Sequence, residues 1–293
     1  MTENQQKSRV KSIAGAVIFG VLTIFLIFLS IKALMQYDNM EPIREGAAVV
    51  TDGRILRENE GKVVIVSGRA EADGITLSDT DFDVTVQSPY LERHVEMRQW
   101  VNSRGYGQEN GTMEVRWSSF VERDQDNGGN RYYNPDSIPF KGAVFSSTVK
   151  LGEFKLSDEL FEKLLRLPDR ITNATELTNK GADRNGLQLK GNEYFFDNRK
   201  LYGFGDVRVY FTKADTSRLG EITVMAKQEE GMLTAYDTEE ISPISLLYDG
   251  IISKDKVLRA AKSDEKSGTI TMICLIFLFA GLTVLYVRRY LKP

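Results

Sequence analysis

The sequence holds few residues that could carry catalysis or bind a metal ion. Among its 293 residues there is one His, His94, and one Cys, Cys274. A Ser-His-Asp or Cys-His site would have to use His94, and Cys274 lies far from it in an apolar run. The same counts exclude multi-histidine metal sites, thiolate clusters and a disulfide framework. We therefore expect no catalytic, metal-binding or cofactor-binding residues and no cofactor.

The densest group of polar and aromatic residues runs from Arg93 to Trp100. On a strand, His94, Glu96, Arg98 and Trp100 would share one face. We interpret this group as a candidate interface or structural motif, with Trp100 as an anchor; its members are Arg93, His94, Glu96, Arg98 and Trp100. In the structural interpretation, Glu96 pairs with Arg98 or a cross-strand cation, while His94 and Trp100 pack under a loop. A His94–Glu96 general-base pair is the third, less favoured interpretation.

The elements that would position these residues are mainly strands. Period-2 alternation with β-branched and aromatic residues predicts strands at residues 62–69, 82–87, 91–101, 113–121, 206–211, 221–227 and 232–236. One helix is predicted between Ser157, which can cap its first turn, and Pro168. A second helix should begin near Ser253 and lead directly into the apolar run that follows. Residues 102–111 and 124–134, rich in Gly, Asn and charge, are expected to be loops.

Two apolar runs predict membrane-spanning helices. Residues 13–31 and 269–287 are each 19 residues long and carry no charge. At about 1.5 Å per residue, each run spans roughly 28 Å, close to the hydrocarbon core of a bilayer. A buried soluble helix would show a polar stripe, and the first run is too long for a cleaved signal peptide. We expect transmembrane helices at 13–35 and 267–288, flanking a β-rich domain at 36–266.

The charges flanking these runs predict an orientation. Basic residues precede the first run and follow the second: Lys7, Arg9, Lys11, Arg288, Arg289 and Lys292. By the positive-inside bias, tails 1–12 and 289–293 should be cytoplasmic and the domain should lie across the membrane. The expected fold class is α+β: a mostly β extracytoplasmic domain flanked by two transmembrane α-helices. The net charge of -3 argues against nucleic acid as a partner.

Several blocks of the sequence resemble the transmembrane protein 43 (LUMA) family. The block from Arg93 to Met97 with Gln99-Trp100-Val101 is similar to a stretch of that family. Further similar blocks follow the family's order from Asn59 to the second apolar run; they are 59–64, 134–135, 151–157 and 205–209. The animal proteins carry further membrane helices after the domain, whereas this sequence ends at Pro293. We therefore expect either a short member or a truncated chain.

The resemblance implies an integral membrane protein with a large non-cytoplasmic domain and no established catalytic activity. In animals such proteins lie in the endoplasmic reticulum and inner nuclear membrane, self-associate and organise membrane protein complexes that include emerin and lamins. A role in ion conductance has been proposed for them. For this chain, we expect the plasma membrane in a prokaryote, and the endoplasmic reticulum or inner nuclear membrane in a eukaryote.

Three features together predict a non-enzymatic membrane scaffold. They are the two membrane-spanning helices, the lack of a set of catalytic residues and the resemblance to the family. The domain would self-associate and organise membrane protein complexes, so its partners would be further copies, other membrane proteins and the lipid bilayer. The alternatives are an oligomeric channel or transport subunit and a membrane-tethered envelope or lipid sensor. A tethered hydrolase that uses His94 and Glu96 is a further alternative.

Overall fold

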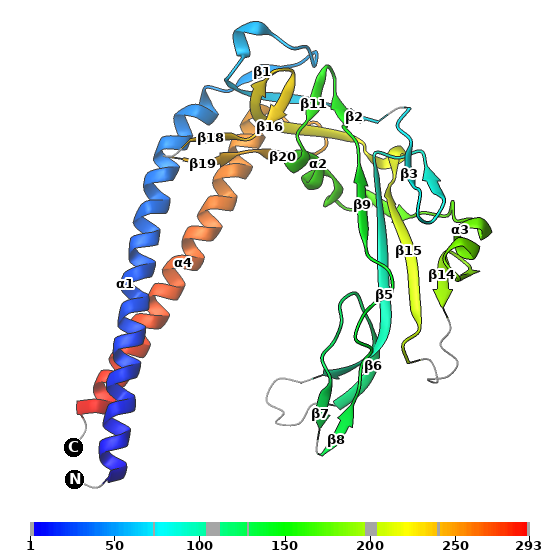
Figure 1. The fold of residues 1–293 in the computed structure, drawn as a ribbon. Coiled ribbons are helices and arrows are strands. Elements are labelled where there is room, and N and C mark those ends of the chain that lie inside the picture. The colour runs from blue at the N-terminus through cyan, green and yellow to red at the C-terminus, as the bar shows by residue number, and fades with distance from the viewer. Residues whose placement is uncertain are drawn as a thin grey trace. The chain divides into compact units, whose positions relative to one another are not determined.

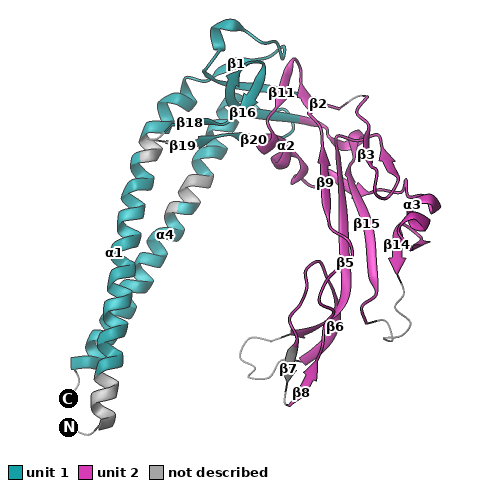
Figure 2. Cartoon of the chain, in the orientation of Figure 1, with its two compact units in different colours: residues 1–68, 222–293 teal, residues 69–221 magenta. Residues whose placement is uncertain are grey.

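The computed structural model describes residues 3–72, 74–103, 112–127, 129–196, 204–238 and 241–291. The chain folds into two compact units (Figure 2). The first comprises residues 1–68 and 222–293, and the second comprises residues 69–221. The chain passes into the second unit within β2 (Val63–Glu71) and returns at the start of β16 (Glu221–Glu229). The range 36–266, which the sequence treats as one domain, is thus divided between both units.

Two long helices belong to the first unit: α1 (Glu3–Glu45) and α4 (Lys254–Leu291). By length and composition, the segments Val10–Glu45 and Ile270–Leu291 could each cross a membrane. Their large apolar side chains are exposed, which suits contact with lipid. The helix predicted near Ser253 does run without a break into the second apolar run. Both helices extend beyond the apolar runs themselves.

The two helices lie side by side, with the start of α1 beside the end of α4 (Figure 1). Gly15 allows the closest approach, because a Cβ there would lie 2.4 Å from a ring carbon of Tyr286. The rings of Phe19 and Phe279 stack with centroids 5.8 Å apart. The helix pair is therefore packed through small and aromatic residues, as is typical where lipid offers no hydrophobic driving force.

The strands of the first unit cover the ends of both helices. Here β2 pairs in parallel with β1 (Ala48–Val50), and β16 pairs antiparallel with β17 (Met232–Thr234) and β20 (Leu246–Asp249). The remaining elements are the 3-10 turn η1 (Arg57–Asn59) and the hairpin of β18 (Tyr236–Thr238) and β19 (Ile241–Ile244). Met40 of α1 and Val257 of α4 are buried in one cluster with strand residues. The helices are therefore built into the core of this unit.

An antiparallel sheet with a long central strand, β5 (Tyr90–Ser103), forms the second unit. Its order is β13-β14-β15-β5-β6, with β12 beside β15 and β9 beside β5. Their bounds are β6 (Thr112–Ser118), β9 (Ala143–Ser146), β12 (Ile171–Asn173), β13 (Gln188–Lys190), β14 (Glu193–Phe196) and β15 (Val207–Ala214). One face of the sheet is covered by a core that includes Phe82, Leu91, Val95 and Phe211. The other face is half-exposed.

Shorter elements complete the second unit. They are β3 (Leu77–Asp79), β4 (Val84–Val86), β7 (Gln125–Asn127), β8 (Asn130–Tyr132), β10 (Lys150–Leu151), β11 (Phe154–Leu156), α2 (Asp158–Leu165), α3 (Asn179–Arg184) and the 3-10 turn η3 (Thr216–Arg218). Helix α2 is capped by Ser157, as predicted. The expectation of a loop at 124–134 is wrong, because β7 and β8 pair there. Strand β5 also continues to Ser103, into the other predicted loop, of which residues 104–111 lie outside the described residues.

Candidate functional site

Strand β5 divides the predicted motif between its two faces. Burial alternates along the strand, so that His94, Glu96, Arg98 and Trp100 share the half-exposed face, as the sequence predicts. Arg93 lies on the opposite, core-facing side and is only 8% exposed. The structure therefore brings four of the five residues together and separates Arg93 from them.

Glu96 is held by a cross-strand cation. The antiparallel register places Arg208 of β15 opposite Glu96, and both Nε and Nη2 of Arg208 lie 2.6 Å from Glu96 Oε2. The same guanidinium lies over the ring of Trp117 from β6, with its carbon 4.6 Å from the ring centroid. This arrangement confirms the cross-strand cation of the structural interpretation. Such a half-exposed pair is worth about 1 kcal/mol.

His94 is fixed by β15 as well. Its ring stacks on Tyr210 with centroids 4.7 Å apart, and its Nε2 shares a 2.8 Å hydrogen bond with Thr212 Oγ1. The carboxylate near His94 belongs to Glu92, whose Oε2 lies 3.5 Å from Nε2, rather than to Glu96. The idea of a His94–Glu96 base pair is therefore not supported, because Arg208 engages Glu96 and a different carboxylate approaches His94.

Glu92 also receives a hydrogen bond from the hydroxyl of Tyr90, with the oxygens 2.6 Å apart. Burial, together with this bond and the charge of Glu92, raises the pKa of the Tyr90 hydroxyl well above its usual value of 10.0. Tyr90 therefore stays protonated at ordinary pH and remains a donor. The side chains of Tyr90 and Glu92, near the start of β5, are thus ordered before any partner binds.

Trp100 packs against the hairpin that the sequence describes as a loop. Its backbone N–H donates to Asn134 Oδ1 at 2.8 Å, and Asn134 Nδ2 donates to its carbonyl at 2.9 Å. The indole meets Tyr132 of β8 edge to face, with centroids 4.9 Å apart.

Arg98 is half-buried, and among the described residues no carboxylate lies within ion-pair distance of it. Arg98 lies on the half-exposed face of β5.

Arg93 has a structural setting on the core-facing side. Its Nη1 lies 3.2 Å from Oδ2 of the buried Asp79 and 3.1 Å from Oδ2 of Asp81. Its guanidinium also lies 4.8 Å from the centroid of the Phe82 ring. Burial raises the pKa of Asp79 despite the nearby arginine. Breaking this buried pair would leave a charge without compensation.

The exposed face is larger than the sequence indicates, because β6 and β15 add Trp117, Arg208 and Tyr210 to it. We call this surface the β5–β15 strip; its members are Glu92, His94, Glu96, Arg98, Trp100, Trp117, Arg208 and Tyr210. The added residues are remote in sequence, and strand alternation alone could not reveal which of them face β5. The strip combines both signs of charge with four aromatic or imidazole rings, and its tryptophans, tyrosine and arginines are residue types enriched in protein interfaces.

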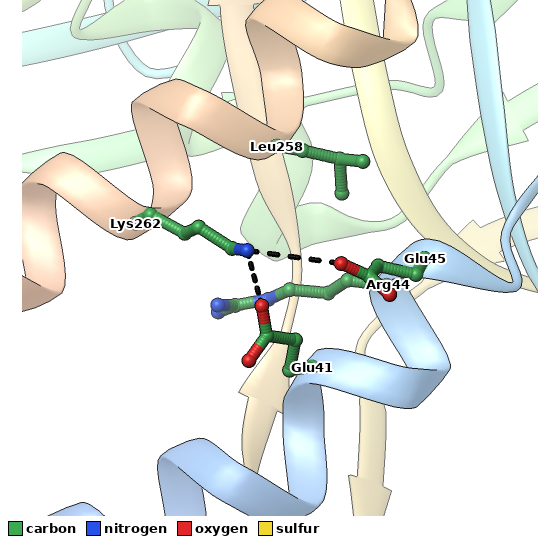
Figure 3. A pocket seen from close by; sticks show the side chains of 5 residues that line it. All are labelled: Glu41, Arg44, Glu45, Leu258 and Lys262. Carbon is green, nitrogen blue, oxygen red and sulfur yellow. Dashed lines mark ion pairs between the residues drawn. The ribbon is translucent and has the colours of Figure 1, made fainter.

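The first unit has its own charged cluster, where α1 and α4 leave their apolar runs. Lys262 of α4 points toward Glu41 and Glu45 of α1 and forms ion pairs with both (Figure 3). Lys254 donates to the carbonyls of Glu45 and Ala47, 2.6 and 2.7 Å away, and so caps α1. The cavity beside these residues has a volume of about 10 Å³, no more than one water needs. This cluster therefore fastens the two helices together.

In the part of the chain that the structure describes, no group of three or more His, Cys, Asp or Glu side chains could hold a metal ion. Cys274 is exposed on α4, within the second apolar run. The expected absence of a metal site and cofactor stays a prediction.

Comparisons with known proteins place the chain in a family. The sequence model of the family described as Transmembrane protein 43 matches residues 97–291. The chain is 26% identical to Transmembrane protein 43 of Mus musculus, over 89% of this chain and 70% of that protein. It is 26% identical to the Homo sapiens protein, over 85% of this chain and 67% of that one. The Transmembrane protein 43 homolog of Drosophila melanogaster is 27% identical, over 75% and 62%.

No solved structure matches the chain. The family model covers well over half of the sequence. Two helices long and apolar enough to span a bilayer agree with the names of the relatives. The protein is an integral membrane protein, and the chain belongs to the transmembrane protein 43 family.

Proposed function

We propose that the protein is a membrane-anchored scaffold that self-associates through the β5–β15 strip and thereby organises membrane protein complexes. The single observation that carries this proposal is the strip itself, a half-exposed face whose aromatic and charged side chains are held in place by cross-strand contacts. Side chains that are already ordered lose little conformational entropy on binding, so such a face is suited to association.

The charge pattern of the strip favours a second copy of the chain as the occupant. Glu92 lies toward one end of the β5 segment and Arg98 toward the other. A twofold axis near the middle of this segment would bring Arg98 of one copy opposite Glu92 of the other, and the reverse. Trp100 and Tyr210 would supply the aromatic area that anchors protein interfaces.

The proposed topology places the strip outside the cytoplasm. Basic residues at the start of α1 and the end of α4 support cytoplasmic termini, by the positive-inside bias. These two ends lie at the same end of the helix pair (Figure 1), as two passages through one bilayer require. The strands between the helices would then face the other compartment, where the scaffold gathers its partners.

Proximity crosslinking in native membranes tests the proposal. In a Cys274→Ser background, a single cysteine is introduced beside the strip by Thr212→Cys, at the β15 position opposite Glu92. In a matched control, the cysteine is introduced at an exposed position of β11 by Lys155→Cys. A bismaleimide reagent should give a covalent dimer with Thr212→Cys and little with Lys155→Cys. Equal yields, or no dimer from either variant, would contradict self-association through this face.

A further inference from the structure

The second unit contains an open pocket of about 590 Å³ that is separate from the β5–β15 strip. Its lining includes Phe82, Arg93, Phe140, Lys141, Arg184 and Asn185. Small-molecule sites usually have volumes of roughly 300 to 1,000 Å³, with apolar walls and a few converging polar groups. The size of this pocket fits that description, whereas its lining is more polar than that of a typical site and includes three cationic side chains.

One wall of the pocket is the turn between β3 and β4, and hydrogen bonds from other segments hold this turn in place. Three successive carbonyls of the turn each accept a hydrogen bond: Thr80 from Arg184 Nη1, Asp81 from Asn185 Nδ2 at 2.9 Å, and Phe82 from Tyr194 Oη at 3.3 Å. The turn also bends back on Asp79, whose Oδ1 accepts the N–H of Asp81 at 3.0 Å. This wall is therefore preformed and needs no ordering by a ligand.

A second part of the lining is the segment just before β9. Phe140 contacts Phe82 edge to face, with ring centroids 5.6 Å apart. Gly142 lets this segment approach β5 closely, because a Cβ there would lie 3.2 Å from the carbonyl of Arg93. Lys141, between these two residues, is exposed at the pocket. The lining thus includes Lys141 from this segment and Arg184 from α3, besides Arg93 of β5.

The acidic residues around the pocket are engaged by other cations. Asp81 accepts hydrogen bonds from Nη1 and Nη2 of Arg93 at 3.1 and 3.2 Å. Asp83, the last residue of the turn, pairs with Lys180 at 2.9 Å. Among the described residues, neither Lys141 nor Arg184 has a carboxylate within ion-pair distance. The charge of Arg184 helps to lower the pKa of Asp83 and its Nη1 donates to the Thr80 carbonyl, so Lys141 is the lining cation with the fewest contacts to other described residues.

We propose that this pocket binds a phosphate monoester that carries an apolar body. A dianion matches the positive charges of Lys141 and Arg184, which line the same pocket, and phosphate is a preferred partner of both side chains. The ring of Phe140 would cover the apolar body, while the side-chain amide of Asn185 lies beside Arg184. The same chemistry occurs in soluble phosphate esters and in the headgroup of phosphatidic acid.

Calorimetric titration with phenyl phosphate tests the proposal on the full chain in phosphatidylcholine nanodiscs. The wild-type protein should bind phenyl phosphate saturably, and more tightly than inorganic phosphate, which lacks the apolar body. Lys141→Glu should weaken binding at least about tenfold, the usual loss when one charge-assisted hydrogen bond to phosphate is removed. Lys155→Glu, the same charge change at an exposed position outside the pocket, should bind like the wild type.

Lipid composition distinguishes the two sources of the ligand. If the headgroup is the ligand, phosphatidic acid in the nanodiscs should compete with phenyl phosphate, while phosphatidylglycerol, a charged phosphodiester, should not. If a soluble ester is the ligand, neither lipid should change the affinity. Absence of saturable binding by the wild type, or binding that Lys141→Glu leaves unchanged, would overturn the proposal. Neither outcome depends on self-association through the strip.

Discussion

Replacing Gly181 of α3 with alanine should destabilise the second unit strongly. A Cβ at this position would lie 1.8 Å from the carbonyl oxygen of Phe82 and 2.6 Å from Tyr194 Oη. Ordinary contacts begin near 3.4 Å, so the helix and the turn would have to separate by about 1.6 Å. Tyr194 is fully buried, and neither it nor the backbone of Phe82 can move aside without disturbing the core.

The size of the effect follows from the contacts that must change. Overpacking of this kind costs about 3 kcal/mol. Displacing the hydrogen bonds from Tyr194 to Phe82 and from Asn185 to Asp81 adds about 1 kcal/mol each. Alanine's better helix propensity returns about 1 kcal/mol. The net loss of about 4 kcal/mol should lower the Tm by roughly 8 to 16 °C for a unit of this size.

Tryptophan fluorescence during thermal unfolding of the full chain in mild detergent measures this effect. The chain has two tryptophans, Trp100 and Trp117, and both lie in the second unit, so the signal reports on that unit. Gly281→Ala is the matched control, because it adds the same methyl group where no atom lies within 4 Å. A Tm for Gly181→Ala within about 2 °C of the wild type would refute the close approach of α3 to the turn.

Three further predictions concern the helix pair, the strip and pH. Gly15→Val should loosen the contact of α1 with Tyr286 and lower the thermal stability of the helices. Far-ultraviolet circular dichroism follows this thermal transition, and an unchanged transition would contradict the contact. A double-mutant cycle of Glu96→Gln and Arg208→Met should give a coupling of about 1 kcal/mol in urea unfolding, and additive effects would contradict the pair. Burial raises the pKa of Glu176, but hydrogen bonds from Lys213 of β15 and from backbone N–H groups, together with the lysine charge, outweigh burial, so this pKa lies below its usual value of 4.5. The ionised Glu176 should therefore stabilise the fold above pH 4.5, and this contribution should be lost as the pH falls through the lowered pKa. The Tm difference between the wild type and Glu176→Gln should accordingly shrink on acidification.

Short-range patterns in the sequence predicted much of the fold. The uncharged runs gave the two long helices, and period-2 alternation located β5 and the face shared by His94 and Trp100. Ser157 marked the start of α2 because capping is a local interaction. These features depend on residues that are neighbours along the chain.

Contacts between distant segments could not be predicted. The partner of Glu96 is 112 positions away, and only the register of β5 with β15 selects it. Helix α3 has six residues, too few for a periodic signal, and it is stabilised by docking on the turn that contains Phe82. The pocket is similarly assembled from the β3–β4 turn, β5, the segment before β9 and α3. The sequence alone does not show that Lys141 and Arg184 line the same pocket.

The oligomeric mass of the full chain in mild detergent tests the central claim most directly. We expect the wild type and the control Lys155→Glu to be oligomers, whereas Arg98→Glu should shift the protein toward the monomer, because it places a carboxylate opposite Glu92 of the second copy. Adding Glu92→Arg to Arg98→Glu should restore the oligomer by exchanging the charges. A monomeric wild type, or an oligomer that Arg98→Glu leaves intact, would contradict a scaffold that assembles through the β5–β15 strip.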